Sequence, residues 1–144
     1  MNNRFKFRVW SNKENKMYKV HSLHLGTNKA IVTSLYGNAS IKLDDKILMQ
    51  STGLKDKNGK LIYEGDIVKY AEFDWADFSF KDWETEMAEV VWGNTYDNYY
   101  PAFDLKQHEF ECNGLAYIFN EGWTIEVIGN IYENPELLKE CEDE

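Results

Sequence analysis

The sequence is 144 residues long, with 43% hydrophobic and 28% charged residues and a formal net charge of −9. This length suits one compact domain, or one domain with an appendage, and can bury a core that needs no metal or disulfide. No apolar run approaches the roughly 20 residues that span a bilayer, and the first residues lack the apolar stretch of a secretory signal. We therefore expect a cytoplasmic protein that has no membrane partner.

Charge divides unevenly along the chain. Residues 1–60 hold 12 Lys and Arg against 4 Asp and Glu, whereas residues 61–144 hold 4 against 21. The two parts attract each other, either within one chain or between the basic end of one copy and the acidic face of the next. This charge asymmetry predicts association within the chain or between copies of it, and it does not indicate a catalytic activity.

Residues 1–50 are expected to form an N-terminal β region. Apolar and basic residues alternate over residues 4–10, which is typical of a half-buried strand. Residues 17–20 return as a second strand after a polar turn, so the hairpin carries three cations on its exposed face: Arg4, Lys6 and Arg8. Two further short strands are expected in residues 21–50, with Gly37 and Asn38 in the turn between them.

Residues 51–144 are expected to form a small antiparallel barrel, because short β-prone runs alternate with Gly and Asn turns. Asn58 and Gly59 suit a type I′ hairpin turn, and Gly65 with Asp66 re-aims the chain between two strands. Trp92 and Trp123 are predicted core aromatics. A short C-terminal helix is predicted over residues 135–141, with Asn134 as its N-cap and Pro135 at its first position.

An acidic and aromatic insertion occupies residues 71–88. Five large aromatic residues alternate there with carboxylates, and a merely solvated loop seldom needs them. One hypothesis is a partner-binding arm in which the aromatics anchor and the carboxylates steer; its contact residues would be Trp75, Phe78 and Trp83. The other is an extended hairpin whose aromatics complete the core or a contact between copies.

These segments resemble the YopX-like family of bacteriophage and prophage proteins. The resemblance rests on five stretches in the family's order: Lys6–Trp10, Asn15–Tyr18, Leu48–Lys60, Ile62–Val68 and Trp123–Leu138. It implies a phage-derived protein in a bacterial host cell, a β fold whose barrel is SH3-like, and self-association into a homo-oligomer. It implies no particular biochemical activity, and residues 71–88 and 94–121 depart from the family's pattern.

The residues that could carry chemistry do not assemble into a motif. His21 and His24 are three apart, which places them on opposite faces of a regular strand, and zinc needs three or four converging ligands. The sequence contains no nucleophile-elbow motif of hydrolases, no phosphate-binding loop motif and no glycine-rich motif for dinucleotide binding. The cysteines, Cys112 and Cys141, are expected to be free thiols. We predict no metal, no cofactor and no enzymatic activity.

The sequence thus predicts a mainly β, non-enzymatic phage or prophage accessory protein that self-associates and binds a host or phage protein. Two alternatives remain open. The cationic N-terminal strand could bind nucleic-acid phosphates, or the acidic part could mimic DNA and act on a host protein.

Overall fold

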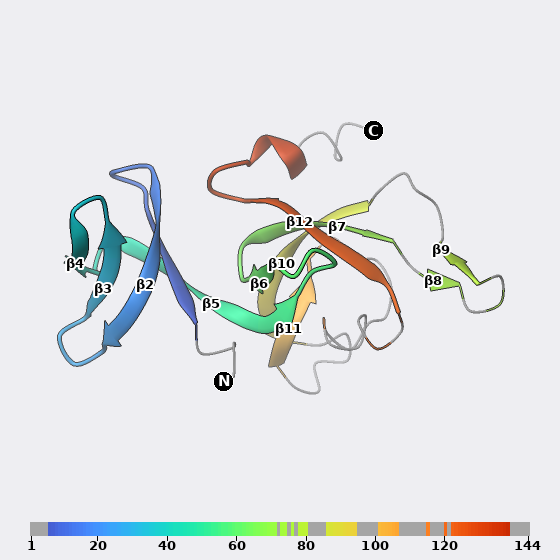
Figure 1. Cartoon of the computed structure of the whole chain (residues 1–144), viewed down its shortest axis with the longest axis horizontal. Helices are drawn as coiled ribbons and strands as arrows, with labels where there is room; N and C mark the ends of the chain where they lie inside the picture. Colours follow the sequence, from blue (N-terminus) through green and yellow to red (C-terminus); the bar gives the residue numbers. More distant parts are fainter. Residues whose placement is uncertain are drawn as a thin grey trace. The chain divides into compact units, whose positions relative to one another are not determined.

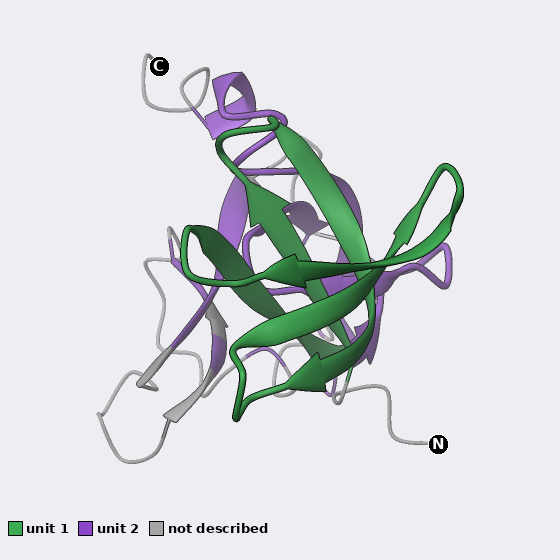
Figure 2. Cartoon of the chain, turned by 90° about the vertical axis from the view of Figure 1, so that its left-hand side faces the viewer, with its two compact units in different colours: residues 1–53 green, residues 54–144 purple. Residues whose placement is uncertain are grey.

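The computed structural model describes residues 6–71, 73–74, 76, 78–80, 86–94, 101–106, 115, 120 and 122–138. The chain divides into two compact units, residues 1–53 and 54–144 (Figure 2). Both consist mainly of antiparallel strands (Figure 1), which confirms the predicted mainly β class.

Five strands form the sheet of the first unit: β1 (Phe7–Ser11), β2 (Lys16–His24), β3 (Lys29–Ser34), β4 (Gly37–Lys42) and β5 (Lys46–Lys55). Their order is β4-β3-β2-β1-β5, and β5 continues across the division between the units. Short turns place β1 to β4 beside their neighbours in sequence. β5 returns to pair with the free side of β1, from Phe7↔Gln50 to Ser11↔Lys46.

One face of this sheet carries the core of the first unit. Its buried members are Val9, Ala30, Val32 and Leu43, and partly buried hydrophobic residues from β2 and β4 pack against them. The alternation of side chains along each strand sends the residues between these positions to the other face.

The structure corrects the prediction for residues 21–50. Three strands begin in this stretch where we expected two, and the β3–β4 turn contains Leu35 and Tyr36. Gly37, predicted to lie in the turn, begins β4 and pairs with Ser34. The Ser34 hydroxyl donates a 2.6 Å hydrogen bond to the Gly37 carbonyl, and Gly37 takes a φ of +113°. The Ser34 hydrogen bond and the positive φ of Gly37 therefore place the turn at residues 35 and 36, two residues before the predicted position.

The second unit contains β6 (Leu61–Tyr63), β7 (Asp66–Ala71), β8 (Phe73–Asp74), β9 (Ser79–Phe80), β10 (Glu86–Asn94), β11 (Pro101–Leu105) and β12 (Thr124–Asn130). β7 lies between β10 and β12 in a sheet of order β11-β10-β7-β12, and β8 pairs with β9. β6 pairs with β5. The core combines residues of several of these strands with Leu115, which lies between β11 and β12: Ile62, Val68, Tyr70, Ala88, Val90, Leu105, Leu115 and Ile125.

The predicted closed barrel is wrong for the residues that the structure describes. The sheet of the second unit ends in β11 on one side and β12 on the other, and these two strands do not pair. Closure requires the edge strands to hydrogen-bond to each other. Whether the unit resembles an SH3 domain stays a prediction.

Two further predictions need correction or limits. Trp92 is 55% exposed and meets Phe103 edge-on, so it is not a core residue. Trp123 does pack against the core and stacks on Tyr70, with ring centroids 5.9 Å apart. Residues 136–138 form a helical turn, and the end of the predicted helix lies outside the described residues.

Candidate functional site

Asp56 is the first residue to test for chemistry, because it is a carboxylate with only 6% of its surface exposed. Its Oδ1 accepts hydrogen bonds from the backbone N–H groups of Asn58 and Lys60, both at 2.9 Å. Its Oδ2 accepts a third from the N–H of Val127, also at 2.9 Å. Asp56 thus closes the turn after β5 and ties it to β12.

The main chain of this turn completes the same arrangement. The N–H of Gly59 donates to the Asp56 carbonyl at 3.0 Å, and Gly59 takes a φ of +81°, whereas Asn58 is not left-handed. The predicted type I′ turn is therefore wrong, since that turn needs positive φ at both central residues. The Asp56 carboxylate favours a three-residue connection that ends in one left-handed glycine.

Burial by itself raises the pKa of Asp56, but three backbone N–H groups and nearby Lys60 outweigh it and hold the pKa below its ordinary value. An ionised carboxylate only accepts hydrogen bonds, and this one is occupied by the turn it organises. Its arrangement serves folding and leaves no proton at neutral pH for acid catalysis.

Asp66 and Gly65 perform a similar structural role between β6 and β7. Asp66 is 1% exposed, and its Oδ2 accepts a hydrogen bond from the N–H of Tyr63 at 2.8 Å. Gly65 has a φ of +86°, as its predicted turn requires, and donates its N–H to the Val90 carbonyl at 2.8 Å. The carbonyl of Gly65 accepts from Ile131 at 3.0 Å, so this turn links β10 to the end of β12.

The end of β12 is shaped by two asparagines. Asn130 Oδ1 accepts hydrogen bonds from the N–H groups of Tyr132 and Glu133, at 3.1 and 2.9 Å. Asn134 Oδ1 accepts from the N–H of Asn130 at 3.2 Å. The side chain predicted to cap the helix therefore points back to the strand, and the Asn134 carbonyl accepts from Leu137 instead.

The predicted partner-binding arm is described at one of its three contact residues. Phe78 is 77% exposed and precedes β9 with a φ of +52°. A bulky side chain in this left-handed region is an outlier, because its Cβ crowds the backbone. Trp75 and Trp83 lie outside the described residues.

The predicted cationic strand is less accessible than expected. Lys6 is exposed, but Arg8 is half-buried, and Arg4 lies outside the described residues. Arg8 stands opposite Lys19 on one side and opposite Met49, which is 1% exposed, on the other. Because β1 lies inside the sheet, residues of β2 and β5 flank Arg8 on both sides, and the residue that we placed on an open face is half-buried.

His21 and His24 lie on the same face of β2, contrary to the prediction. The β2–β3 register shifts between Val20 and Ser22, and this β-bulge adds one residue to β2. An extra residue reverses the alternation that follows it. His21 hydrogen-bonds Thr33, but the described part of the chain contains no group of three His, Cys, Asp or Glu that could hold a metal. His108 and both cysteines lie outside it.

The sequence reasoning missed the tip of the β3–β4 hairpin. Leu35 is 89% exposed and Tyr36 is 99% exposed. A signal was present, since a turn between two β-prone runs seldom contains two large apolar residues.

Across the described residues, no helix is both long enough and apolar enough to cross a membrane.

Comparisons with known proteins place these features in a family. A family model described as "YopX protein" matches residues 6–139. A crystal structure of protein EF1440 from Enterococcus faecalis is 29% identical, with a TM-score of 0.57, and the match covers 92% of this chain and 96% of that one. The crystal structure of YopX from Bacillus subtilis is 22% identical, with a TM-score of 0.51 and coverage of 95% and 98%. Among curated proteins none matches.

Proposed function

The chain belongs to the YopX family, and on that premise we propose that it is a non-enzymatic phage or prophage accessory protein that binds a host or phage protein. Its contact residues are in the arm of residues 72–86. The observation that carries this proposal is Phe78, a large aromatic side chain that is 77% exposed in a left-handed backbone conformation.

The stability of the fold does not explain why Phe78 is exposed in a left-handed backbone conformation. Exposing a large apolar side chain to water forgoes about 1.5–3 kcal/mol of burial, and the backbone conformation adds strain. A glycine or asparagine would suit such a backbone better. A pocket on a partner would recover the apolar burial, and central aromatics are the residues that most often dominate a protein interface.

The buried polar groups support the non-enzymatic part of the proposal. The carboxylates of Asp56 and Asp66 accept backbone N–H groups, and the Asn130 side chain organises the turn after β12. A general acid or base needs a proton to exchange near neutral pH. The lowered pKa of Asp56 runs against that requirement.

Affinity capture from host lysate tests the arm. The intact chain, a chain lacking residues 72–86 and the Phe78→Ser variant serve as baits, with Leu25→Ser as the matched control, because Leu25 is also 77% exposed. We expect the deletion and Phe78→Ser to lose the same partner, and Leu25→Ser to retain it. Recovery of one set of proteins by all four baits would exclude the arm as the binding site.

We also propose that copies of the chain associate through opposite charge. Residues 1–53 hold 9 Lys and Arg against 3 Asp and Glu, and residues 54–144 hold 7 against 22. Contacts between such surfaces weaken as salt screens them. The protein should elute as an oligomer from a sizing column in 50 mM salt and shift toward the monomer in 1 M salt. A monomer at both concentrations would refute self-association.

A further inference from the structure

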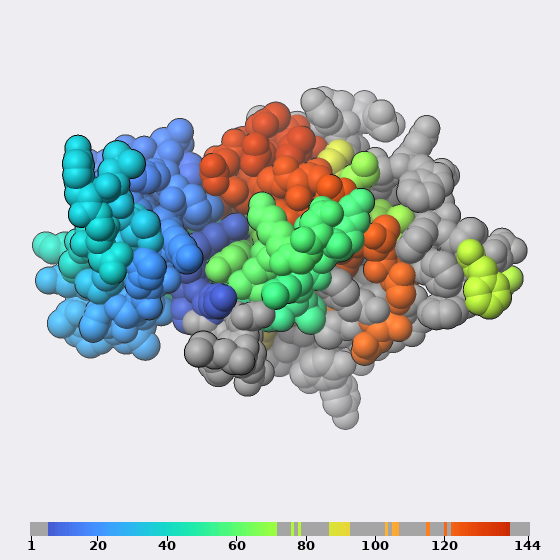
Figure 3. All heavy atoms as spheres, in the orientation of Figure 1, coloured from blue at the N-terminus to red at the C-terminus, as the bar shows by residue number. Residues whose placement is uncertain are grey.

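Strands β2, β3 and β4 share a face that the core of the first unit does not use. We call it the outer face; the strands that carry it are drawn in blue to cyan in Figure 3. Its residues alternate with core residues such as Leu23, Ala30 and Ile41 and therefore point away from the core. The outer face comprises Lys19, His21, Ser22, His24, Lys29, Ile31, Thr33, Asn38, Ser40 and Lys42.

Three basic residues form one row across this face. The strand register pairs His24 with Lys29, and it pairs Lys29 with Lys42. Side chains directly opposite on antiparallel strands lie about 4.5–5.5 Å apart at their Cβ atoms. All three residues are exposed. The β-bulge in β2 is what brings His24 to the same face as the two lysines.

Such a row opposes folding, because like charges placed directly opposite each other destabilise a sheet. Within the first unit the acidic residues do not offset it. Its three carboxylates belong to Glu14, Asp44 and Asp45, and all three residues lie in turns. Lys29 and Lys42 therefore lie on a face that carries no carboxylate of their own unit.

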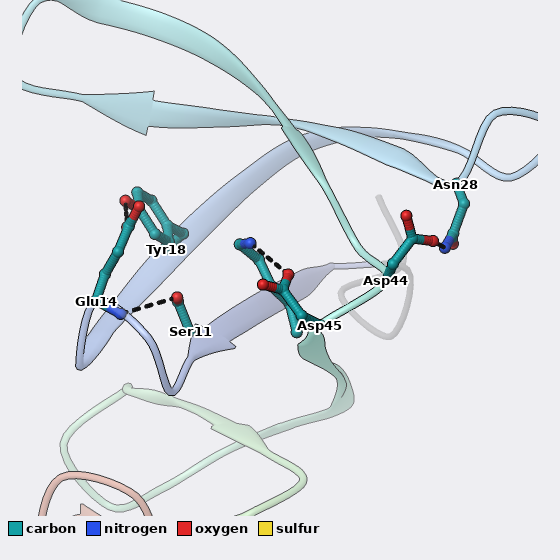
Figure 4. Close-up of polar contacts among 7 residues, drawn as sticks. Ser11, Glu14, Tyr18, Asn28, Asp44 and Asp45 are labelled. Carbon is teal, nitrogen blue, oxygen red and sulfur yellow. Dashed lines mark hydrogen bonds and ion pairs between the residues drawn. The ribbon is translucent and has the colours of Figure 1, made fainter.

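Those carboxylates are already engaged at the turns (Figure 4). Glu14 accepts a hydrogen bond from the Tyr18 hydroxyl, and Asp44 accepts one from the Asn28 side chain. Asp45 forms an ion pair with Lys46 at 2.8 Å, which lowers the pKa of its carboxyl. None of these three carboxylates pairs with the lysines of the outer face, which leaves that face positively charged within its own unit.

The other residues of the outer face suit a polyanion with sugar groups. Ser22, Thr33, Asn38 and Ser40 present hydroxyl and amide groups, which bind phosphate and sugar oxygens in nucleic-acid complexes. Tyr36, at the β3–β4 turn, is 99% exposed. It lies in the turn just beyond the Ser34 and Gly37 pair, and that pair is five residues along the hairpin from the Lys29 and Lys42 pair, a rise of about 17 Å.

We propose that the outer face binds single-stranded nucleic acid, with Lys19, Lys29 and Lys42 on its phosphates and Tyr36 stacked on a base. This combination of a cationic track with an exposed aromatic ring is how single strands are bound without sequence preference. This site differs from the one expected from the sequence, which was the strand that carries Arg8, now found half-buried. Because the lysines would bind phosphates, the affinity is expected to fall as the salt concentration rises.

Fluorescence anisotropy with a labelled 15-nucleotide oligo-dT tests the lysines. Three phosphate contacts predict a slope of log K against log [salt] of about −2, which is about a 20-fold loss of affinity between 50 and 200 mM salt. In K29Q/K42Q, one contact remains and the loss should be about threefold. The matched control is K55Q/K60Q, which removes two exposed lysines of the second unit and should keep the parent slope.

Two further measurements separate binding from structure. Tyr36→Ser should weaken binding about tenfold at every salt concentration without changing the slope, because stacking is not ionic. K29Q/K42Q should melt at the parent temperature or above it, since the variant removes like-charge repulsion.

Several outcomes would overturn the proposal. They are no saturable oligo-dT binding in 50 mM salt, equal losses in K29Q/K42Q and K55Q/K60Q, or equal affinity for a duplex of the same length. A fourth is that K29Q/K42Q leaves oligo-dT binding intact and dissociates an oligomer on the sizing column. In that case the outer face would bind the acidic part of a second copy.

Discussion

Replacing Asp56 removes the carboxylate that ties the turn after β5 to β12. We expect Asp56→Ala to lower the free energy of unfolding of the second unit by about 3–4 kcal/mol. Three N–H···O bonds of 2.9 Å end on this carboxylate, and a hydrogen bond to a charged group contributes about 1.5–3 kcal/mol. The full sum is not reached, because Asn58 and Lys60 lie in an exposed turn where water can replace the lost acceptor.

Asp56→Asn should lose about half as much, close to 2 kcal/mol, because its amide keeps one acceptor oxygen but turns an NH₂ group toward one of the three donors. The control is Asp45→Asn, which changes an exposed carboxylate in a turn of the first unit and should leave the second unit's unfolding midpoint unchanged.

Urea unfolding followed by tryptophan fluorescence measures the overall loss, and hydrogen exchange locates it. In Asp56→Asn the amides of Asn58, Lys60 and Val127 should exchange faster than in the parent, with Val127 the most affected because it lies in β12. The reasoning is refuted if Asp56→Asn unfolds at the parent's urea concentration, or if the Val127 amide stays as protected as before.

The remaining predictions use other contacts. The stabilisation from Asp56, whose folded pKa is lowered, should be complete above about pH 4 and disappear as pH falls through the folded pKa, so the parent and Asp56→Asn should converge in acid unfolding. Gly129→Ala should destabilise by about 1–3 kcal/mol, because a Cβ there would lie 2.5 Å from Asn134 Oδ1; Gly26→Ala, with nothing within 4 Å, is its control in the same melting assay. Lys57→Gln should change the unfolding free energy by less than about 1 kcal/mol, because its 3.1 Å ion pair with Glu126 is partly exposed to solvent.

Local patterns in the sequence identified some of the strands and turns correctly. Alternation predicted β1, and the polar stretch after Trp10 predicted the hairpin that leads to β2, because these signals depend on the side-chain period of a strand. Gly65 was correctly assigned to a turn, since its φ of +86° is a local backbone requirement that glycine meets.

Pairing partners and exposure could not be read in the same way. The sequence shows that Arg8 alternates with Val9, but only the structure shows that β1 lies between β2 and β5 and that Arg8 is half-buried. Trp92 is apolar, yet its strand leaves it 55% exposed. These properties depend on which strands pair, and that is set by contacts between residues far apart in the chain.

For both proposed sites, the sequence determined which residue types are present, and the tertiary structure determined how they are placed. The sequence by itself determined that the arm of residues 72–86 is rich in aromatics and that the basic residues lie in the first part of the chain. Only the tertiary structure decided that Phe78 is exposed at a strained backbone position and that a bulge aligns His24 with Lys29 and Lys42. Composition and period are local properties of a chain, whereas a binding surface requires strand register, and one inserted residue in β2 is enough to change it.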